Sequence, residues 1–168
     1  GYGTVYFVEE MLKHVGQSLN GLRVAVSGSG NVAQFAVEKA MAFGAKVITV
    51  SDSSGTIVDE AGFTPEKLAI LAEVKNHLYG RVSDYAERVG AKFIPGERPW
   101  RVPVDVALPC ATQNEVSEDD AATLIKNGVI CVAEGANMPC TAGAVKRFEH
   151  AKVLFAPGKA SNAGGVAT

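Results

Sequence analysis

The sequence lacks long hydrophobic runs, and its positive and negative charges nearly balance. Its apolar runs reach only about five or six residues, whereas a membrane-spanning helix needs roughly 20. We expect neither a signal peptide nor a membrane span. The formal net charge of −2 gives no general attraction for nucleic acid or acidic membranes. The expected partners therefore include no nucleic acid and no membrane, and any anion must bind at a local site.

Cysteine and histidine are also scarce, with three of each. Cys110, Cys131 and Cys140 form no CxxC pair and no cluster with histidine, which argues against a zinc site or a disulfide framework. We expect no metal site, and buried thiols in a protein of the reducing cytoplasm.

The bulk composition is that of a globular protein. The chain has 168 residues, of which 47% are hydrophobic and 20% charged, enough to bury the core of one domain. It starts at GYGTVYF without methionine and stops within a run of small residues, NAGGVAT. We expect residues 1–168 to be a single dinucleotide-binding domain excised from a longer chain.

Helical and strand-like segments alternate along the sequence. Apolar periodicity and capping residues predict helices over 4–15, 31–43, 65–78, 117–127 and 141–150, and a short helix from residue 83. Short apolar runs predict strands over 22–27, 46–51, 91–94, 104–109, 129–133 and 153–156. This order predicts an α/β fold with a doubly wound, mostly parallel sheet of the Rossmann type, which binds ligands beyond the carboxyl ends of its strands.

A glycine-rich turn links the first predicted strand to the next helix. Its sequence, GxGxxA, is the run Gly28, Ser29, Gly30, Asn31, Val32 and Ala33. Gly28 permits the tight turn, Gly30 has no side chain to block a pyrophosphate, and Ala33 lets helix and strand pack closely. The helix N-terminus adds free N–H groups and partial positive charge. With a strand before it and a helix after it, the turn predicts a dinucleotide site rather than a simple connection.

The segment after the second predicted strand bears on the choice between NAD and NADP. An acid such as Asp52 at this place usually accepts a hydrogen bond from the ribose 2′-OH of NAD. Ser53 next to it could instead serve a phosphate, with Lys75 and Arg81 supplying positive charge. A solvated helix end is the alternative explanation of those two cations. We expect NADP as cofactor, with NAD still possible.

Two further loops follow later predicted strands and contain hydroxyl and carboxamide side chains. Thr112, Gln113 and Asn114 lie in CATQNE, and Asn137 lies in EGANMP. These groups can donate or accept hydrogen bonds toward a ribose or a carboxamide. The alternative is that they only satisfy the loop backbone.

The segments GSGNVA, SDSSG, LPCATQNE, AEGANMP and FAPGKASNAGGVAT together resemble the cofactor domain of the hexameric, NADP-preferring glutamate dehydrogenases, over essentially the whole chain. The resemblance assigns the phosphates to two groups of residues: the pyrophosphate to Gly28, Gly30 and Asn31, and the adenosine 2′-phosphate to Ser53, Lys75 and Arg81. It also implies that Ala111, Thr112 and Asn137 line the nicotinamide half of the site, and that Asn162 and Val166 face the substrate cleft.

The same resemblance implies the chemistry of the whole enzyme, which is reversible oxidative deamination of L-glutamate to 2-oxoglutarate and ammonia by a homohexamer. In the family, a lysine and an aspartate of the substrate domain transfer protons, and neither matches a position in this chain. We therefore expect no catalytic residue here, and a fragment that binds cofactor without turnover. The alternatives are the cofactor domain of a leucine or phenylalanine dehydrogenase, and a nucleotide-sensing module without catalytic activity.

Overall fold

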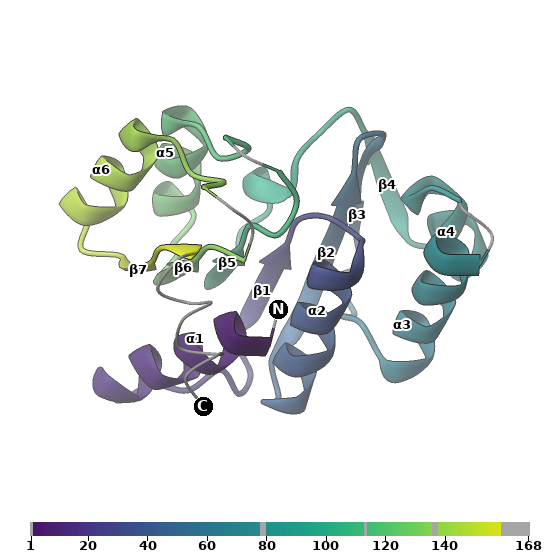
Figure 1. Cartoon of the computed structure of the whole chain (residues 1–168), viewed down its shortest axis with the longest axis horizontal. Coiled ribbons are helices and arrows are strands. Elements are labelled where there is room, and N and C mark those ends of the chain that lie inside the picture. The colour runs from purple at the N-terminus through teal and green to yellow at the C-terminus, as the bar shows by residue number, and fades with distance from the viewer. Residues whose placement is uncertain (1, 78–79, 113, 136–137, 159–168) are drawn as a thin grey trace.

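The computed structural model describes residues 2–77, 80–112, 114–135 and 138–158. Within these ranges, a seven-stranded sheet runs in the order β4-β3-β2-β1-β5-β6-β7 (Figure 1). All neighbouring pairs are parallel except β2 with β3 and β3 with β4. The strands are β1 (Arg23–Val26), β2 (Lys46–Asp52), β3 (Gly55–Val58), β4 (Lys92–Pro95), β5 (Val106–Leu108), β6 (Cys131–Ala133) and β7 (Leu154–Ala156).

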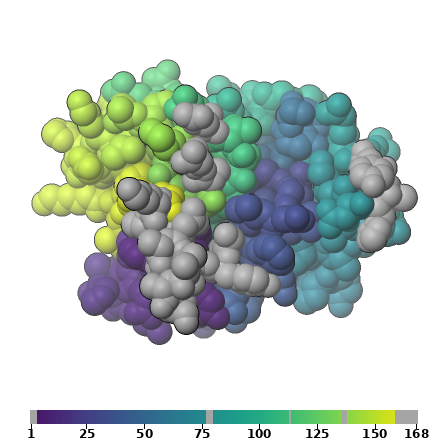
Figure 2. Space-filling view, viewed as in Figure 1, coloured from purple at the N-terminus to yellow at the C-terminus, as the bar shows by residue number. Residues whose placement is uncertain are grey.

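Helices cover both faces of the sheet. The described helices are α1 (Tyr2–His14), α2 (Asn31–Ala42), α3 (Pro65–Ala72), α4 (Val82–Val89), α5 (Glu118–Lys126) and α6 (Ala142–His150). A π-helical turn, Glu73–His77, follows α3, and a 3₁₀ turn, Pro99–Arg101, precedes β5. Helices α1, α2 and α4 pack on one face, whereas α5, α6 and the 3₁₀ turn pack on the other. Figure 2 shows the purple α1 beside the yellow-green C-terminal elements, in agreement with its contacts to β6 and β7.

Side chains of each central strand point alternately into two hydrophobic cores. In β1, Val24 and Val26 belong to the core under α1 and α2, and Ala25 belongs to the core under α5 and α6. Because successive strand residues face opposite sides of a sheet, a strand covered on both faces is apolar along most of its length. The second core also contains the buried Trp100, which anchors the segment before β5.

The predicted fold is confirmed, with one strand missed. The predicted helices and strands all have counterparts, although the helix expected over 65–78 changes to the π-helical turn after Ala72. Strand β3 was not predicted because GTIV follows a serine-rich turn and begins with glycine. Gly55 has a φ of +153°, and a Cβ there would lie 2.3 Å from the Ile94 carbonyl oxygen. Gly55 is thus required because β3 and β4 approach closely there, but in the sequence this glycine looks like part of a turn.

Strand β1 is the switch point of the sheet, where the order in which strands are added changes from one side to the other. From β1 the sheet extends through β2 on one side, and β5 pairs on the other side. The connections from these strands diverge at their carboxyl ends, which leaves a crevice there. Both the glycine loop and the CATQNE segment start at this edge. Within the described ranges, every helix is too short or too polar to cross a membrane.

Candidate functional site

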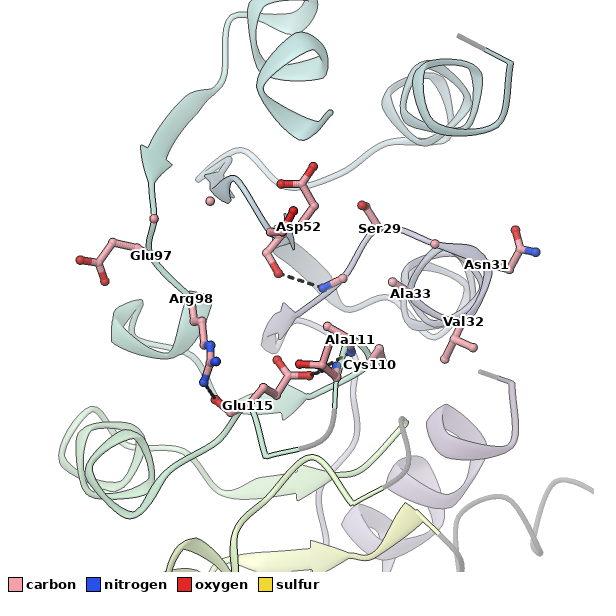
Figure 3. Close-up of a pocket in the computed structure, with 17 residues that line it drawn as sticks. Ser29, Asn31, Val32, Ala33, Asp52, Glu97, Arg98, Cys110, Ala111 and Glu115 are labelled. Atoms are coloured by element: carbon pink, nitrogen blue, oxygen red, sulfur yellow. Dashed lines mark hydrogen bonds between the residues drawn. The ribbon is translucent and has the colours of Figure 1, made fainter. Parts of the chain in front are cut away.

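A pocket of about 640 Å³ lies at the carboxyl ends of β1, β2 and β5 (Figure 3). Segments far apart in the sequence form its walls. In Figure 3, Glu97 and Arg98 lie across the pocket from the glycine loop, and the Arg98 side chain points toward Glu115. The lining consists of residues 28–33, 51–53, 96–98 and 110–112 with Gly55 and Glu115.

Gly28 makes the turn out of β1 and is locked against β2. Its φ of +86° is in the left-handed region, which favours glycine. Its N–H donates to Ser51 Oγ at 2.9 Å, and the Ser51 N–H donates to the Gly28 carbonyl oxygen at 3.1 Å. A Cβ at Gly28 would lie 3.1 Å from the Cys110 carbonyl oxygen. The backbone of the loop is therefore held between β2 and the end of β5.

Gly30 has a different environment. It is the N-cap of α2, its φ is −79°, and a Cβ there would meet no atom within 4 Å. Helices α3, α5 and α6 have their first N–H groups capped by Thr64, Ser117 and Thr141, but α2 has no side-chain cap. The first turn of a helix has N–H groups without intrahelical partners and a partial positive charge. The uncapped start of α2 beside the pocket can therefore bind an anion.

Asp52 lies at the end of β2, and both of its carboxylate oxygens are engaged. Oδ1 accepts hydrogen bonds from the N–H (2.7 Å) and the hydroxyl of Ser54. Oδ2 accepts a hydrogen bond from the Val82 N–H at 2.9 Å and lies 3.5 Å from Lys75 Nζ. A carboxylate has about four acceptor positions, so these four donors use essentially all of its capacity. Asp52 thereby ties the β2 end to the π-helical turn and to the start of α4.

We predict that Asp52→Asn destabilises the chain by about 2 kcal/mol at neutral pH, because its amide group would face the N–H of Ser54 or Val82. Burial tends to raise the pKa of Asp52, but hydrogen bonds from Ser54 and Val82 and the Lys75 charge outweigh it and hold the pKa below its ordinary 3.8. A lowered pKa means that the stabilisation is full above pH 3.8 and is lost as the pH falls below that value. Urea unfolding at neutral pH and near pH 3 should therefore show a difference between parent and variant that narrows in acid.

Glu87→Gln is a suitable control for this experiment, because Glu87 is an exposed acid on α4. It should change the free energy of unfolding by less than about 0.5 kcal/mol at either pH. A difference between Asp52→Asn and the parent that stays constant from neutral pH to pH 3 would contradict the ionised, hydrogen-bonded role of Asp52.

Two cations flank the Asp52 corner of the pocket. Lys75 lies in the π-helical turn and reaches Asp52, while Arg81 precedes α4 and its Nη1 is 3.4 Å from Ser53 Oγ. Arg81 and Ser53 are exposed. Lys75, Arg81 and the Val82 N–H therefore place positive charge and hydrogen-bond donors near the Asp52 carboxylate.

The CATQNE loop is organised around Glu115, which sequence reasoning did not select. Glu115 is only 2% exposed, and its Oε2 accepts hydrogen bonds from the N–H groups of Ala111 (2.9 Å) and Thr112 (3.0 Å). Arg98 Nη1 donates to the Glu115 carbonyl oxygen at 2.5 Å, as Figure 3 shows. Burial raises the pKa of Glu115, although its hydrogen bonds and the Arg98 charge oppose that rise.

A second loop, after β6, is held by another buried acid. Glu134 is 5% exposed; its Oε2 accepts from the Cys140 N–H at 3.0 Å and its Oε1 from the Gly158 N–H at 2.9 Å. The two loops meet where the Asn114 N–H donates to the Met138 carbonyl oxygen at 3.1 Å. In the sequence, Glu115 and Glu134 each stand out only as a single acid in a loop that follows an apolar strand. That pattern does not distinguish a buried acid from a solvated one.

The three cysteines are buried, as predicted, and are free thiols in the structure. Burial raises the pKa of Cys110 and Cys131 to about 12 and raises that of Cys140 as well. A protonated thiol is a poor nucleophile, so Cys110 contributes to the pocket by its shape alone. Among the described residues, no group of three or more His, Cys, Asp or Glu side chains is placed to hold a metal ion.

The structure brings together most of the residues that the sequence singled out. The pocket lining includes the glycine loop (Gly28, Ser29, Gly30, Asn31, Val32, Ala33), Asp52, Ser53, Ala111 and Thr112. Lys75 and Arg81 do not line the pocket themselves, but Lys75 contacts the lining residue Asp52 and Arg81 contacts the lining residue Ser53. Asn114 lies outside this lining and contacts the loop after β6. Gln113, Asn137, Asn162 and Val166 lie outside the described residues.

Comparisons with known proteins agree with this geometry. The chain is 67% identical over all 168 residues to an NADP-specific glutamate dehydrogenase of Salmonella typhimurium, of which it covers 38%. It is 56% identical, again over 168 residues and 38% of the relative, to an NAD(P)-specific glutamate dehydrogenase of Xylanibacter ruminicola. A crystal structure of glutamate dehydrogenase from Plasmodium falciparum superposes with a TM-score of 0.94 at 47% identity, over 99% of this chain and 36% of that one.

The chain thus spans well under half the length of these relatives. The model of the family described as glutamate/leucine/phenylalanine/valine dehydrogenase matches residues 1–168. With this match over its whole length, and with the glycine loop at the switch point of the sheet, the chain belongs to the glutamate/leucine/phenylalanine/valine dehydrogenase family.

Proposed function

We propose that this chain is the NADP(H)-binding domain of a glutamate dehydrogenase, which interconverts L-glutamate with 2-oxoglutarate and ammonia. The observation that carries the proposal is the open, uncapped start of α2 at Gly30, on the wall of a pocket at the sheet switch point. Open space and free N–H groups together fit a pyrophosphate. Gly28, Ser29, Gly30, Asn31, Val32 and Ala33 would hold it.

The contacts of Asp52 favour NADP over NAD. An acid that selects NAD needs a free lone pair for the ribose 2′-OH, and the lone pairs of Asp52 are already engaged by Ser54, Val82 and Lys75. Ser53, Lys75 and Arg81 would instead bind the 2′-phosphate. One unit-charge pair near 4 Å is worth about 4 kcal/mol at an effective dielectric of 20, so two cations more than offset the repulsion from one carboxylate. The name of the Salmonella relative points to the same cofactor.

The nicotinamide half would lie along the CATQNE side of the pocket. Ala111 and Thr112 are exposed there, and we assign Gln113, Asn114 and Asn137 to the same region. A bound nicotinamide supplies hydride transfer, while the residues of this chain bind and orient it. We infer that the groups which bind glutamate and move protons belong to the part of the enzyme outside this chain. Asn162 and Val166 would face that part.

The proposed assembly follows from the family resemblance. The full-length enzyme would be a cytoplasmic homohexamer, and this chain would bind cofactor without turning over glutamate. Residues 1–168 would constitute one cofactor domain of that longer enzyme.

Nucleotide titration of the chain tests the assignment. We expect NADPH to bind more tightly than NADH, as measured by nicotinamide fluorescence. Lys75→Ala and Arg81→Ala should each weaken NADPH binding about tenfold, which corresponds to roughly 1.4 kcal/mol and is close to the lower end of the range for a charge-assisted hydrogen bond. NADH affinity should stay the same, because NADH lacks the 2′-phosphate.

A control variant separates specific from general electrostatics. Lys13→Ala removes one exposed positive charge from α1, and Lys13 is not among the residues that line the pocket. It should leave both affinities at the parent value. Equal affinities for NADPH and NADH in the parent and in both pocket variants would refute the NADP assignment, and absence of binding by either nucleotide would refute the proposed function of the chain.

A further inference from the structure

Glu115 is a buried acid whose described hydrogen-bond donors are two main-chain amides and one hydroxyl rather than a cation. Its Oε2 accepts from the consecutive N–H groups of Ala111 and Thr112. The Ser27 hydroxyl also hydrogen-bonds to the carboxylate, and Ser27 Oγ accepts from the Cys110 N–H at 2.9 Å. The turn that leaves β5 is thus wrapped around one carboxylate, which Ser27, the residue directly after β1, also holds.

Such an arrangement needs a reason, because burying a carboxylate is costly unless hydrogen bonds replace its water. The nearby guanidinium does not neutralise it directly, since Arg98 Nη1 donates to the Glu115 carbonyl oxygen. Arg98 instead ties the segment after β4 to the backbone of the same loop. The stabilisation of Glu115 therefore depends on the shape of the loop, and the shape of the loop depends on Glu115.

The hydrogen bonds to Glu115 determine what the loop presents to the pocket. With their N–H groups bonded to the carboxylate, Ala111 and Thr112 remain exposed on the pocket wall. We infer that Glu115 is a positioning residue for the nicotinamide half of the dinucleotide: it fixes the main chain of Ala111 and Thr112 as a rigid wall against that half. This inference rests on the proposed function.

The role of Glu115 is local, because the far end of the loop has its own anchors. The Asn114 N–H donates to the Met138 carbonyl oxygen, and the Val116 N–H donates to the Pro139 carbonyl oxygen at 2.9 Å. These bonds join the loop to the segment after β6 and are independent of the Glu115 side chain. Removing the carboxylate should therefore release the segment at Ala111 and Thr112 while the rest of the pocket keeps its shape.

Two ligands distinguish this local effect from general destabilisation. Adenosine 2′,5′-bisphosphate is the adenosine half of NADPH and should bind near Ser53, Lys75 and Arg81. In Glu115→Ala we expect NADPH affinity to fall about tenfold and the affinity for adenosine 2′,5′-bisphosphate to stay at the parent value. Glu115→Gln should lie between parent and Glu115→Ala, because its amide oxygen can still accept from the two N–H groups and its amide nitrogen can donate to Ser27.

Glu118→Gln is the matched control, because Glu118 is an exposed acid nearby that pairs with Arg147 on the surface. It should change neither affinity. If the parent binds neither ligand, the proposed function fails, and this inference fails with it. If the parent binds NADPH more tightly than the adenosine half and both Glu115 variants keep that ratio, only this inference is overturned. Parallel loss of both ligands would also overturn it, because Glu115 would then support the whole domain.

Discussion

Gly30→Asp is expected to abolish dinucleotide binding without destabilising the fold. Gly30 has an ordinary φ of −79° and open space around its Cβ position, and aspartate is a favourable N-cap residue, so the free energy of unfolding should change by only a few tenths of a kcal/mol. The new carboxylate would occupy the place proposed for the pyrophosphate. One repulsive charge pair near 4 Å opposes binding by about 4 kcal/mol at an effective dielectric of 20, which is roughly a thousandfold in Kd. NADPH titration and thermal unfolding of the same samples measure both effects.

Two further variants separate charge from volume at Gly30. Gly30→Asn adds a side chain of nearly the same size as aspartate without the charge, so its loss of NADPH affinity should be clearly smaller. Gly30→Ala adds one methyl group in open space and should have the mildest effect. If Gly30→Asp binds NADPH as the parent does, the pyrophosphate is not at the start of α2, and the proposed orientation of the cofactor is wrong.

The features that local sequence determines were predictable. The glycine loop follows an apolar strand and opens a helix, and this context alone identified the place of the pocket. Caps at Thr64 and Ser117 marked helix starts that the structure confirms. Such features depend on residues within a few positions of each other, so their physical causes are visible in the sequence.

Features that depend on distant partners were not predictable in the same way. The carboxylate of Asp52 suggested a ribose ligand, but its oxygens are engaged by Lys75 and by the start of α4, which the chain reaches only after another helix. Arg98 entered no prediction because its place in the pocket depends on the β3–β4 pair, and β3 was missed. Glu115 looked like any loop acid, since the burial that makes it unusual is a property of the assembled sheet edge.

Gly28→Val should destabilise the chain strongly, in contrast to changes at Gly30. Gly28 has a φ of +86°, and a Cβ there would lie 3.1 Å from the Cys110 carbonyl oxygen and 3.3 Å from Ala111 Cα. Left-handed backbone at a β-branched residue costs about 1–3 kcal/mol, and overpacking against backbone costs a similar amount. We therefore expect a loss of about 3 kcal/mol in urea unfolding, and a melting temperature lower by about 10 °C for a chain of this size.

The same substitution two residues later is the matched control for this prediction. Gly30→Val places the same side chain in open space at a permissive φ, so it should cost less than about 1 kcal/mol. If the two variants lost the same free energy of unfolding, the end of β5 would be able to move aside for a side chain at Gly28. The left-handed φ at Gly28 would then not be the reason for glycine at that position. A large loss at Gly28 with a small one at Gly30 would leave ligand binding as the reason for the second glycine, because the fold itself tolerates a side chain at that position.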